Sequence, residues 1–219
     1  KTALGKVVPA TVQIKVAGVN RQEWSGSGFI LDPADAARLL PGVQMEPGTY
    51  LIPTNHHVAA EALSITVITA DGKRRLSAEV VKAPSGAELL DEVGDTALLK
   101  VKSVEPLPTA KIGPRSALEQ GDTVLTAGYP LALPRISVTK GIISQTEQMT
   151  GETLLAIQAD APINPGNSGG PLFTLGGTIV GTNTYTFRGA NDLTFANAIT
   201  EQFKLLGTIW QKGAIVRGD

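Results

Sequence analysis

The sequence predicts an all-β protein of about twelve short strands. Its 219 residues include 24 glycines and 14 prolines, while aromatic residues make up only 5%. Short apolar or alternating segments recur along the chain, separated by turn residues, and only the last part of the chain has a helical period. Strands of this length and spacing are typical of a sandwich or a barrel.

The first half of the chain contains six of these segments. Alternation of apolar and polar residues from Thr11 predicts a half-buried strand. After the second strand we expect a short helix at 33–40 with Asp32 as its N-cap, within a surface insertion at 32–49. The strands are expected at 7–19, 29–31, 50–52, 63–68, 75–82 and 96–101.

The second half contains six further strands and then changes to a helical period. We expect a helix at about 199–212, because apolar side chains return there every three or four positions. Its apolar face consists of Ile199, Phe203, Leu206 and either Ile209 or Trp210. The strands are expected at 123–128, 136–146, 154–160, 171–174, 178–184 and 193–198.

A joint rich in proline and glycine, near residues 105–120, separates the two sets of strands. We therefore expect an N-terminal β unit at 1–112 and a C-terminal β unit with the helix at 113–219. The turn-forming residues of the joint are Pro106, Pro108, Gly113 and Pro114.

Composition excludes several classes of protein and site. The sequence has no cysteine, which rules out disulfides, thiolate zinc sites and a cysteine nucleophile. The net charge is −1 without a run of like charges, which argues against nucleic-acid binding and a polybasic membrane patch. No apolar run approaches the length of a membrane span. Because the chain begins at Lys1 without an initiator methionine, we expect a processed or excised piece.

Residues 164–172, Asn-Pro-Gly-Asn-Ser-Gly-Gly-Pro-Leu, surround the hydroxyl of Ser168 with turn-forming residues. Glycines allow positive φ and close approach by other groups, and prolines exclude a helix interior or a central strand. Acyl transfer needs an exposed nucleophile of this kind with backbone amides beside it. The alternative interpretation is a turn between two strands with an incidental serine.

A serine nucleophile needs a base, and the base needs an acid that orients it. The only histidines are the neighbours His56 and His57, whose side chains would point to opposite faces of an extended backbone. A zinc site on this pair would be unusual without cysteine. Asp95 is the best candidate acid because a strongly apolar strand follows it directly. The rival carboxylates are Asp71, Asp122, Asp160 and Asp192.

The order of these residues separates two kinds of hydrolase. The segment around Ser168 also fits the G-x-S-x-G pattern of α/β-hydrolases, which would indicate an esterase or a lipase. That fold places its histidine after the serine, whereas no histidine follows Ser168 here and Pro171 leads into a strand. The order His, Asp, Ser on an all-β chain is that of the two-barrel chymotrypsin-like proteases.

The motifs of the chain resemble those of the HtrA (Deg) branch of these proteases. Residues 54–58 (Thr-Asn-His-His-Val) resemble the Thr-Asn-x-His-Val motif of the base, and residues 95–100 resemble the Asp-x-Ala-Leu-Leu-Lys motif. Residues 166–172 resemble the nucleophile loop. Further matches are residues 25–29, 128–130, 158–164, 195–196 and 198–199, so the resemblance covers essentially the whole chain.

The resemblance implies two six-stranded antiparallel barrels with a catalytic triad of His57, Asp95 and Ser168, in which His56 is not the base. It also implies an oxyanion hole at residues 166–168, formed by the amides of Gly166 and Ser168 with Asn167 between them. Pro162 stands six residues before Ser168, where a trypsin-like pocket would carry an acid, so we expect cleavage after small or medium apolar residues. The implied substrate pocket consists of Pro162, Ile163, Asn164, Gly181, Thr182 and Asn183.

The same resemblance implies a serine endopeptidase that hydrolyses unfolded or damaged proteins outside the cytoplasm, in the bacterial periplasm or cell envelope. It implies protein or peptide substrates, no metal or cofactor, and a homo-oligomer, such as a trimer, as one form of the full-length protein. Residues 213–219 resemble the segment before the PDZ domain in this family, although a relative without that domain would have the same sequence here. Three features depart from the family pattern: Tyr129 replaces a common Asn, residues 194–200 replace Gly-Phe-Ala-Ile-Pro, and the insertion at 32–49 differs in length from the regulatory loop of several relatives. The competing class is a binding or scaffold module that kept the fold but lost turnover.

Overall fold

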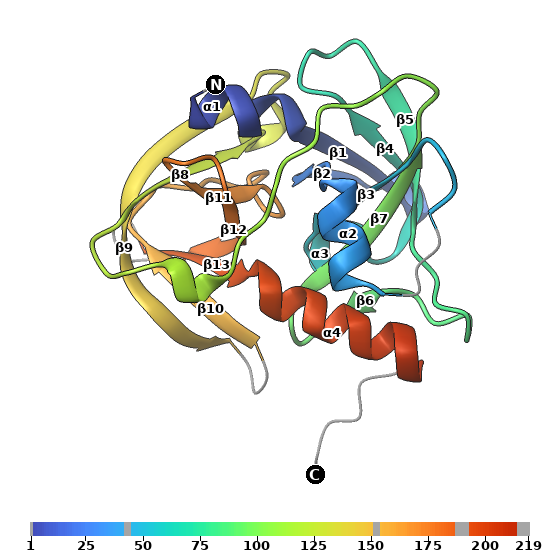
Figure 1. The fold of residues 1–219 in the computed structure, drawn as a ribbon. Coiled ribbons are helices and arrows are strands. Elements are labelled where there is room, and N and C mark those ends of the chain that lie inside the picture. Colours follow the sequence, from blue (N-terminus) through green and yellow to red (C-terminus); the bar gives the residue numbers. More distant parts are fainter. Residues whose placement is uncertain (1, 42–44, 151–153, 187–192, 214–219) are drawn as a thin grey trace.

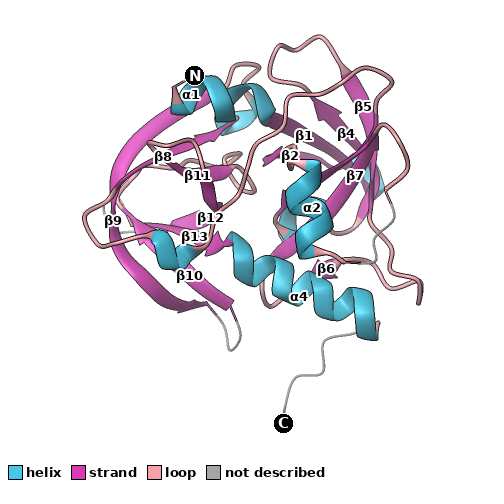
Figure 2. Ribbon diagram, in the orientation of Figure 1, coloured by secondary structure: helices cyan, strands magenta, loops and turns pink. Residues whose placement is uncertain are grey.

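Two β units lie side by side in the computed structural model, which describes residues 2–41, 45–150, 154–186 and 193–213 (Figure 1). Most of the regular structure is strand, and helix α4 (Ile199–Lys212) runs from the second unit along one end of the first (Figure 2). The prediction of an all-β fold with a C-terminal helix is therefore confirmed.

The first unit is a half-barrel of seven antiparallel strands in the order β2-β1-β4-β5-β7-β3, with short β6 paired to β7. The end strands β2 and β3 are not paired with each other in the described part of the chain. Just beyond β2, the Leu31 amide donates to the Leu51 carbonyl at 2.9 Å. The strands are β1 (Thr11–Gly18), β2 (Glu23–Phe29), β3 (Thr49–Thr54), β4 (Ala62–Ile68), β5 (Arg75–Val80), β6 (Leu90–Asp91) and β7 (Thr96–Lys102).

The second unit is a closed six-stranded barrel in the order β10-β13-β12-β11-β8-β9. All of its neighbouring strands are antiparallel, and its interior is filled by apolar residues such as Val124, Ile157 and Leu172. The strands are β8 (Thr123–Gly128), β9 (Ser137–Thr150), β10 (Leu154–Ala159), β11 (Pro171–Thr174), β12 (Ile179–Thr186) and β13 (Thr194–Ala198). The chain passes between the units after Lys102 and before Thr123, and the division at residue 112 stays a prediction.

Local helices account for the differences from the expected elements. Helix α1 (Ala3–Val7) and a 3₁₀ turn (Val8–Ala10) replace the start of the strand expected from residue 7, because Thr2 caps α1 and Pro9 opens the turn. The histidine pair lies in the one-turn helix α3 (His56–Ala59) and not in extended backbone. The remaining 3₁₀ turns are Val19–Arg21, Arg115–Ala117 and Pro130–Ala132.

Two predicted helices form where the sequence placed them. Helix α2 (Pro33–Leu39) begins after Asp32, whose carboxylate accepts from the Ala34 amide at 2.9 Å. Helix α4 ends at Gly213, whose φ of +77° is typical of a helix C-cap. No helix among the described residues is long and apolar enough to cross a lipid bilayer.

One core cluster joins the two β units through α4. The cluster includes Phe29 and Leu51 of the first unit, Phe173 of the second, and Phe203 and Leu206 of α4, each at most 2% exposed. Burial of apolar surface is the largest favourable contribution to folding. The relative position of the two units is therefore set largely by this shared core.

The substitution Phe203→Ala tests the importance of this helix. We expect the free energy of unfolding to fall by about 3–5 kcal/mol, because a buried aromatic ring leaves a cavity when it is removed. Urea unfolding followed by circular dichroism would measure the change. The control Leu63→Ala truncates a side chain that is 72% exposed, and its effect should stay within about 0.5 kcal/mol. Equal effects of the two substitutions would contradict the role of α4.

Candidate active site

His57 is held against Asp95 through both its ring and its backbone. Nδ1 of the imidazole lies 2.9 Å from Oδ2 and 3.0 Å from Oδ1 of the carboxylate. The backbone amide of His57 also donates to Oδ1, at 3.0 Å. Helix α3 makes this second contact possible, because amides in the first turn of a helix have no partner within it. Since a carboxylate only accepts, the contact assigns the proton to Nδ1 and leaves Nε2 as an acceptor.

Asp95 lies in a tight turn between β6 and β7. Its φ is +41°, in the left-handed region that residues other than glycine rarely adopt. Within the turn, the Asp95 amide donates to the Glu92 carbonyl at 3.1 Å, and the Gly94 amide donates to the Asp91 carboxylate at 2.6 Å. The side chain of Asp95 is 21% exposed and that of His57 is 51% exposed, so the carboxylate is the more buried partner.

The loop that carries Ser168 is tied to both β units. Its bends fall at Gly166 and Gly169, whose φ angles are +99° and +82°. The Ser168 carbonyl accepts from the Ser27 amide of β2 at 2.8 Å, and the Gly169 amide donates to the Asn183 carbonyl of β12 at 2.7 Å. The loop therefore lies where the half-barrel meets the closed barrel.

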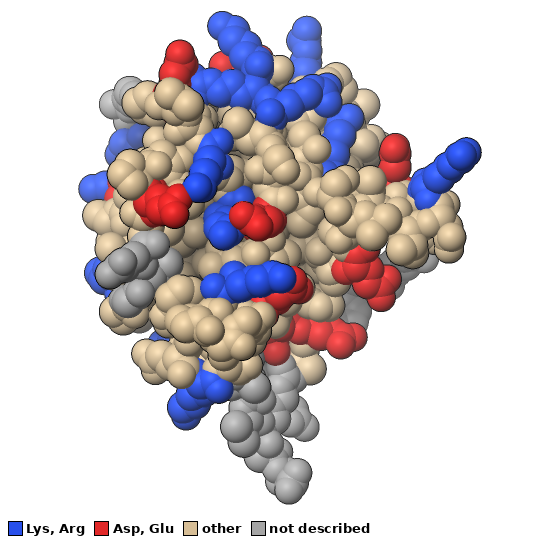
Figure 3. Space-filling model, turned by 90° about the vertical axis from the view of Figure 1, so that its right-hand side faces the viewer, with Lys and Arg blue, Asp and Glu red and all other residues tan. Residues whose placement is uncertain are grey.

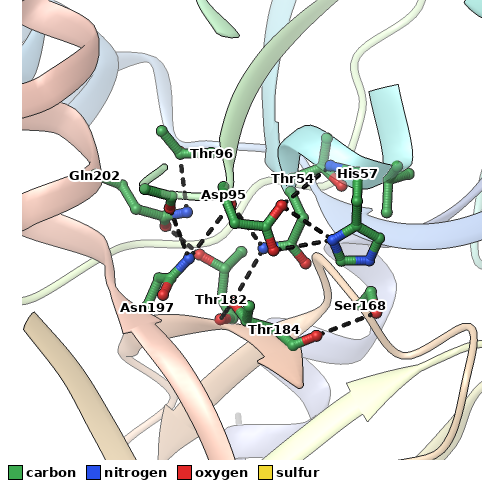
Figure 4. Close-up of polar contacts among 12 residues, drawn as sticks. Thr54, His57, Asp95, Thr96, Ser168, Thr182, Thr184, Asn197 and Gln202 are labelled. Carbon is green, nitrogen blue, oxygen red and sulfur yellow. Dashed lines mark hydrogen bonds and ion pairs between the residues drawn. The ribbon is translucent and has the colours of Figure 1, made fainter. Parts of the chain in front are cut away.

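The hydroxyl of Ser168 donates to the Thr184 carbonyl at 3.4 Å, which is long for a bond between two oxygens. Among the described residues it makes no hydrogen bond with His57. Figure 4 shows the imidazole edge that bears Nε2 turned toward Ser168. A base and a hydroxyl thus face each other without a direct bond between them.

The amides of Gly166 and Ser168 donate no hydrogen bond within the described part of the chain. The carbonyls on either side of the Gly166 amide are engaged elsewhere. The Pro165 carbonyl accepts from the Leu131 amide, and the Gly166 carbonyl accepts from the Ser27 hydroxyl, each at 2.7 Å. Free amides beside a hydroxyl are the donors that can stabilise a developing oxyanion.

Two residues that sequence reasoning left without a role shape this loop. The hydroxyl of Ser27 donates to the Gly166 carbonyl and accepts from the Tyr129 amide at 2.9 Å. Tyr129 is 2% exposed, and burial raises the pKa of its phenol to about 12. The signal in the sequence was Ser27 between two glycines, a pattern that indicates close backbone approach but not what approaches.

None of the other titratable candidates in the described part of the chain hydrogen-bonds to Ser168 or to the His57 ring. The His56 imidazole makes no hydrogen bond among the described residues, although its backbone carbonyl accepts from the Ala60 amide at 2.8 Å, and Asp192 lies outside them. Asp71, Asp122 and Asp160 each accept from backbone amides in turns or at strand ends. Within the described residues, no three His, Asp or Glu side chains gather in a way that could hold a metal ion.

The residues expected in the substrate pocket have unlike environments. Pro162 and Asn164 are exposed and Ile163 is half-buried, whereas Gly181, Thr182 and Asn183 are buried on β12. The Thr182 hydroxyl donates to the side chain of Gln202 on α4, so this side chain faces the helix. Both polar atoms of the Asn183 side chain are buried without a partner in the described structure.

Comparison with known proteins gives the class of this chain. Residues 26–181 match the family model described as the trypsin-like peptidase domain, so the chain belongs to that family. It is 33% identical over 232 residues to "Putative protease Do-like 14" of Arabidopsis thaliana, covering 98% of this chain and 49% of the relative. It is 38% identical over 170 residues to "Probable periplasmic serine endoprotease DegP-like" of Pseudomonas putida (strain W619), covering 75% of this chain and 33% of the relative.

The solved structures narrow the class further. "HtrA-type protease AlgW with tripeptide" superposes with a TM-score of 0.78 at 29% identity, over 99% of this chain and 65% of that one. Within the trypsin-like peptidases, the chain belongs to the HtrA/Deg-like serine proteases. It spans about half or less of the length of these curated relatives.

The substitution Gly169→Ala tests how tightly the loop is held. A Cβ at Gly169 would lie 2.1 Å from the Thr54 hydroxyl and 2.2 Å from the Ser27 carbonyl. The control Gly121→Ala has a similar φ, +93°, but nothing within 4 Å. Gly121→Ala should cost about 1 kcal/mol from backbone strain, and Gly169→Ala about 1–3 kcal/mol more from the clash. Urea unfolding of both variants measures the difference, and equal costs would show a loose loop.

Proposed function

We propose that this chain is a serine endopeptidase with Ser168 as nucleophile, His57 as general base and Asp95 as the acid that orients the imidazole. The observation that supports this most directly is the double contact of His57 with the Asp95 carboxylate, through Nδ1 and through the backbone amide. That contact leaves Nε2 free to take the proton of the Ser168 hydroxyl as the oxygen attacks a peptide carbonyl. Nε2 then returns the proton to the leaving amine.

The amides of Gly166 and Ser168 would stabilise the oxyanion of the tetrahedral intermediate, because neither donates to an acceptor in the described part of the chain. Asn167 lies between them as the third residue of this loop, 3% exposed, with its amide donating to the Asn164 carbonyl at 3.0 Å. That bond supports a fixed curvature of the loop. Removing one oxyanion donor typically costs about 10²–10³ in turnover.

Cleavage after small or medium apolar residues is the specificity we propose. The pocket would be formed by residues 162–164 on one side and Gly181, Thr182 and Asn183 on the other. Position 162 is a proline and not an acidic residue, and Gly181 contributes no side chain from β12 to the pocket. The acid that a trypsin-like pocket would carry six residues before the serine is thus replaced by an uncharged proline.

The cellular role proposed is degradation of unfolded or damaged proteins outside the cytoplasm. Relatives named as periplasmic serine endoproteases support this location. The net charge of −1, and the acidic side chains beside basic ones near the middle of the face in Figure 3, favour protein substrates over nucleic acid. We further propose that the full-length protein is a homotrimer.

A binding module without turnover is the second candidate. The contact of the Ser168 hydroxyl with the Thr184 carbonyl, in place of His57, is the observation that favours it. The two candidates differ in whether Ser168 reacts.

Digestion of unfolded casein separates these functions. The wild-type chain should degrade casein, and Ser168→Ala should lower the rate about 10³-fold or more, because no other nucleophile can replace the hydroxyl. Gel electrophoresis over time measures the rate. Equal, negligible cleavage by both proteins across pH and temperature would contradict the endopeptidase and favour the binding module.

The two histidines provide a matched pair of variants on one helical turn. His57→Ala should lower casein cleavage about 10³-fold or more, because it removes the base. His56→Ala should retain most activity, because the His56 imidazole makes no hydrogen bond among the described residues. Initial rates of peptide release at one substrate concentration are sufficient. A larger loss with His56→Ala would overturn the assignment of the base.

A further inference from the structure

A buried set of side-chain hydrogen bonds joins the two β units directly beneath Asp95. We name it the interbarrel junction, and Figure 4 shows it between α4 and α3. The junction consists of Asn55, Asp95 and Thr96 of the first unit and Thr182, Thr184, Asn197 and Gln202 of the second. Its bonds between the two units join residues more than 100 positions apart in the sequence.

Asn197, near the C-terminal end of β13, binds the backbone of the Asp95 turn. Its side-chain nitrogen donates to the Gly94 carbonyl at 3.0 Å and to the Asp95 carbonyl at 3.3 Å. A carboxamide nitrogen carries two hydrogens, so one group can serve both carbonyls. Asn197 is 1% exposed, and a buried side-chain N–H that lost its acceptor would destabilise the folded state.

Gln202, in the first half of α4, binds the residue that follows Asp95. Its side-chain nitrogen donates to the Thr96 hydroxyl at 3.0 Å, and its oxygen accepts from the Thr182 hydroxyl. Gln202 is fully buried, as are Thr96 and Thr182 to within 1%. The side chain thus connects β7 of the half-barrel with β12 of the closed barrel.

The Asp95 turn needs external support because its backbone is strained. The left-handed φ of +41° would relax if the neighbouring carbonyls were free to rotate. Asn55 supplies one donor to the Asp95 carbonyl from within the first unit, at 3.0 Å. The remaining side-chain donors to Gly94 and Asp95 carbonyls come from Asn197, across the boundary between the units. A rotation of this turn would move the carboxylate that contacts His57.

We infer that Asn197 and Gln202 are positioning residues for the triad. They hold the Asp95 turn from the second β unit, so that the carboxylate meets both Nδ1 and the backbone amide of His57. This inference rests on the proposed function, in which Asp95 orients the base. Neither residue touches the reacting atoms, and Asn197 lies in segment 194–200, which departs from the family motif.

The variants Asn197→Leu and Gln202→Met remove the donors while keeping side chains of similar size. Asn197→Leu should lower kcat about tenfold or more with KM within about twofold of wild type, because the base loses its orientation while Asn197 makes no side-chain bond to the proposed substrate pocket. Gln202→Met should also lower kcat, but its KM is not diagnostic because Gln202 accepts from Thr182 of that pocket. The control Thr11→Val removes another fully buried side-chain bond, to the Val7 carbonyl at 3.1 Å in the first unit. Thr11→Val should leave kcat unchanged.

Proton NMR gives a readout that does not depend on turnover. In a Ser168→Ala background, which prevents self-digestion, the Nδ1 proton of His57 should resonate at low field because of its bond to Asp95. Asn197→Leu and Gln202→Met should move this resonance upfield or abolish it, while Thr11→Val should not. Thermal unfolding identifies the variants that fold, and if Asn197→Leu does not, Gln202→Met decides the result.

Wild-type kcat and an unmoved resonance in the folded variants would overturn the inference. An equal loss of kcat in Thr11→Val would also overturn it, because the effect would then be a general loss of packing. Failure of the wild-type chain to cleave casein would contradict the proposed function instead. In that case the resonance comparison alone still decides whether the junction positions Asp95.

Discussion

The left-handed turn at Asp95 is the constraint on which the site depends. A non-glycine residue in this region costs about 1–2 kcal/mol, and the turn at φ +41° remains only if its neighbours hold it. Three side-chain donations reach the Gly94 and Asp95 carbonyls, and each is worth about 1 kcal/mol net. Two of the three come from Asn197 of the other β unit. The position of the acid is therefore a property of both units together.

The shared core cluster and the interbarrel junction both fix the position of helix α4 relative to the two β units. Helix α4 buries Phe203 and Leu206 in the core cluster shared by both units, and its Gln202 binds Thr96 one position after Asp95. Burial is non-directional and fixes how closely the helix approaches. The hydrogen bonds of Gln202 require particular partners, so they fix its orientation. A shift of α4 would thus reach Asp95 through Thr96.

Sequence reasoning succeeded where the signal was local. The period of residues 199–212 and the N-cap at Asp32 depend on residues a few positions apart, and both helices form as predicted. It failed at residues 7–10, which the predicted strand included although the alternation begins only at Thr11, because the Thr2 cap and Pro9 favour helical turns there. Ser27 and Asn197 could not be found, because their partners lie about 100 or more residues away and nothing local reveals the pairing.

The Ser168 loop needs a small change to become reactive under the proposed mechanism. The hydroxyl bond to Thr184 is 3.4 Å long, whereas oxygen pairs usually bond at about 2.7–2.8 Å, so little is lost when it breaks. Rotation about χ1 of Ser168 moves the hydroxyl without moving the backbone. The backbone itself is held by the bonds of Ser27 and Asn183, and the Gly166 and Ser168 amides have no acceptor among the described residues. Under the proposed mechanism, the Ser168 hydroxyl exchanges the Thr184 carbonyl for Nε2 of His57, while the bonds of Ser27 and Asn183 oppose movement of the loop backbone.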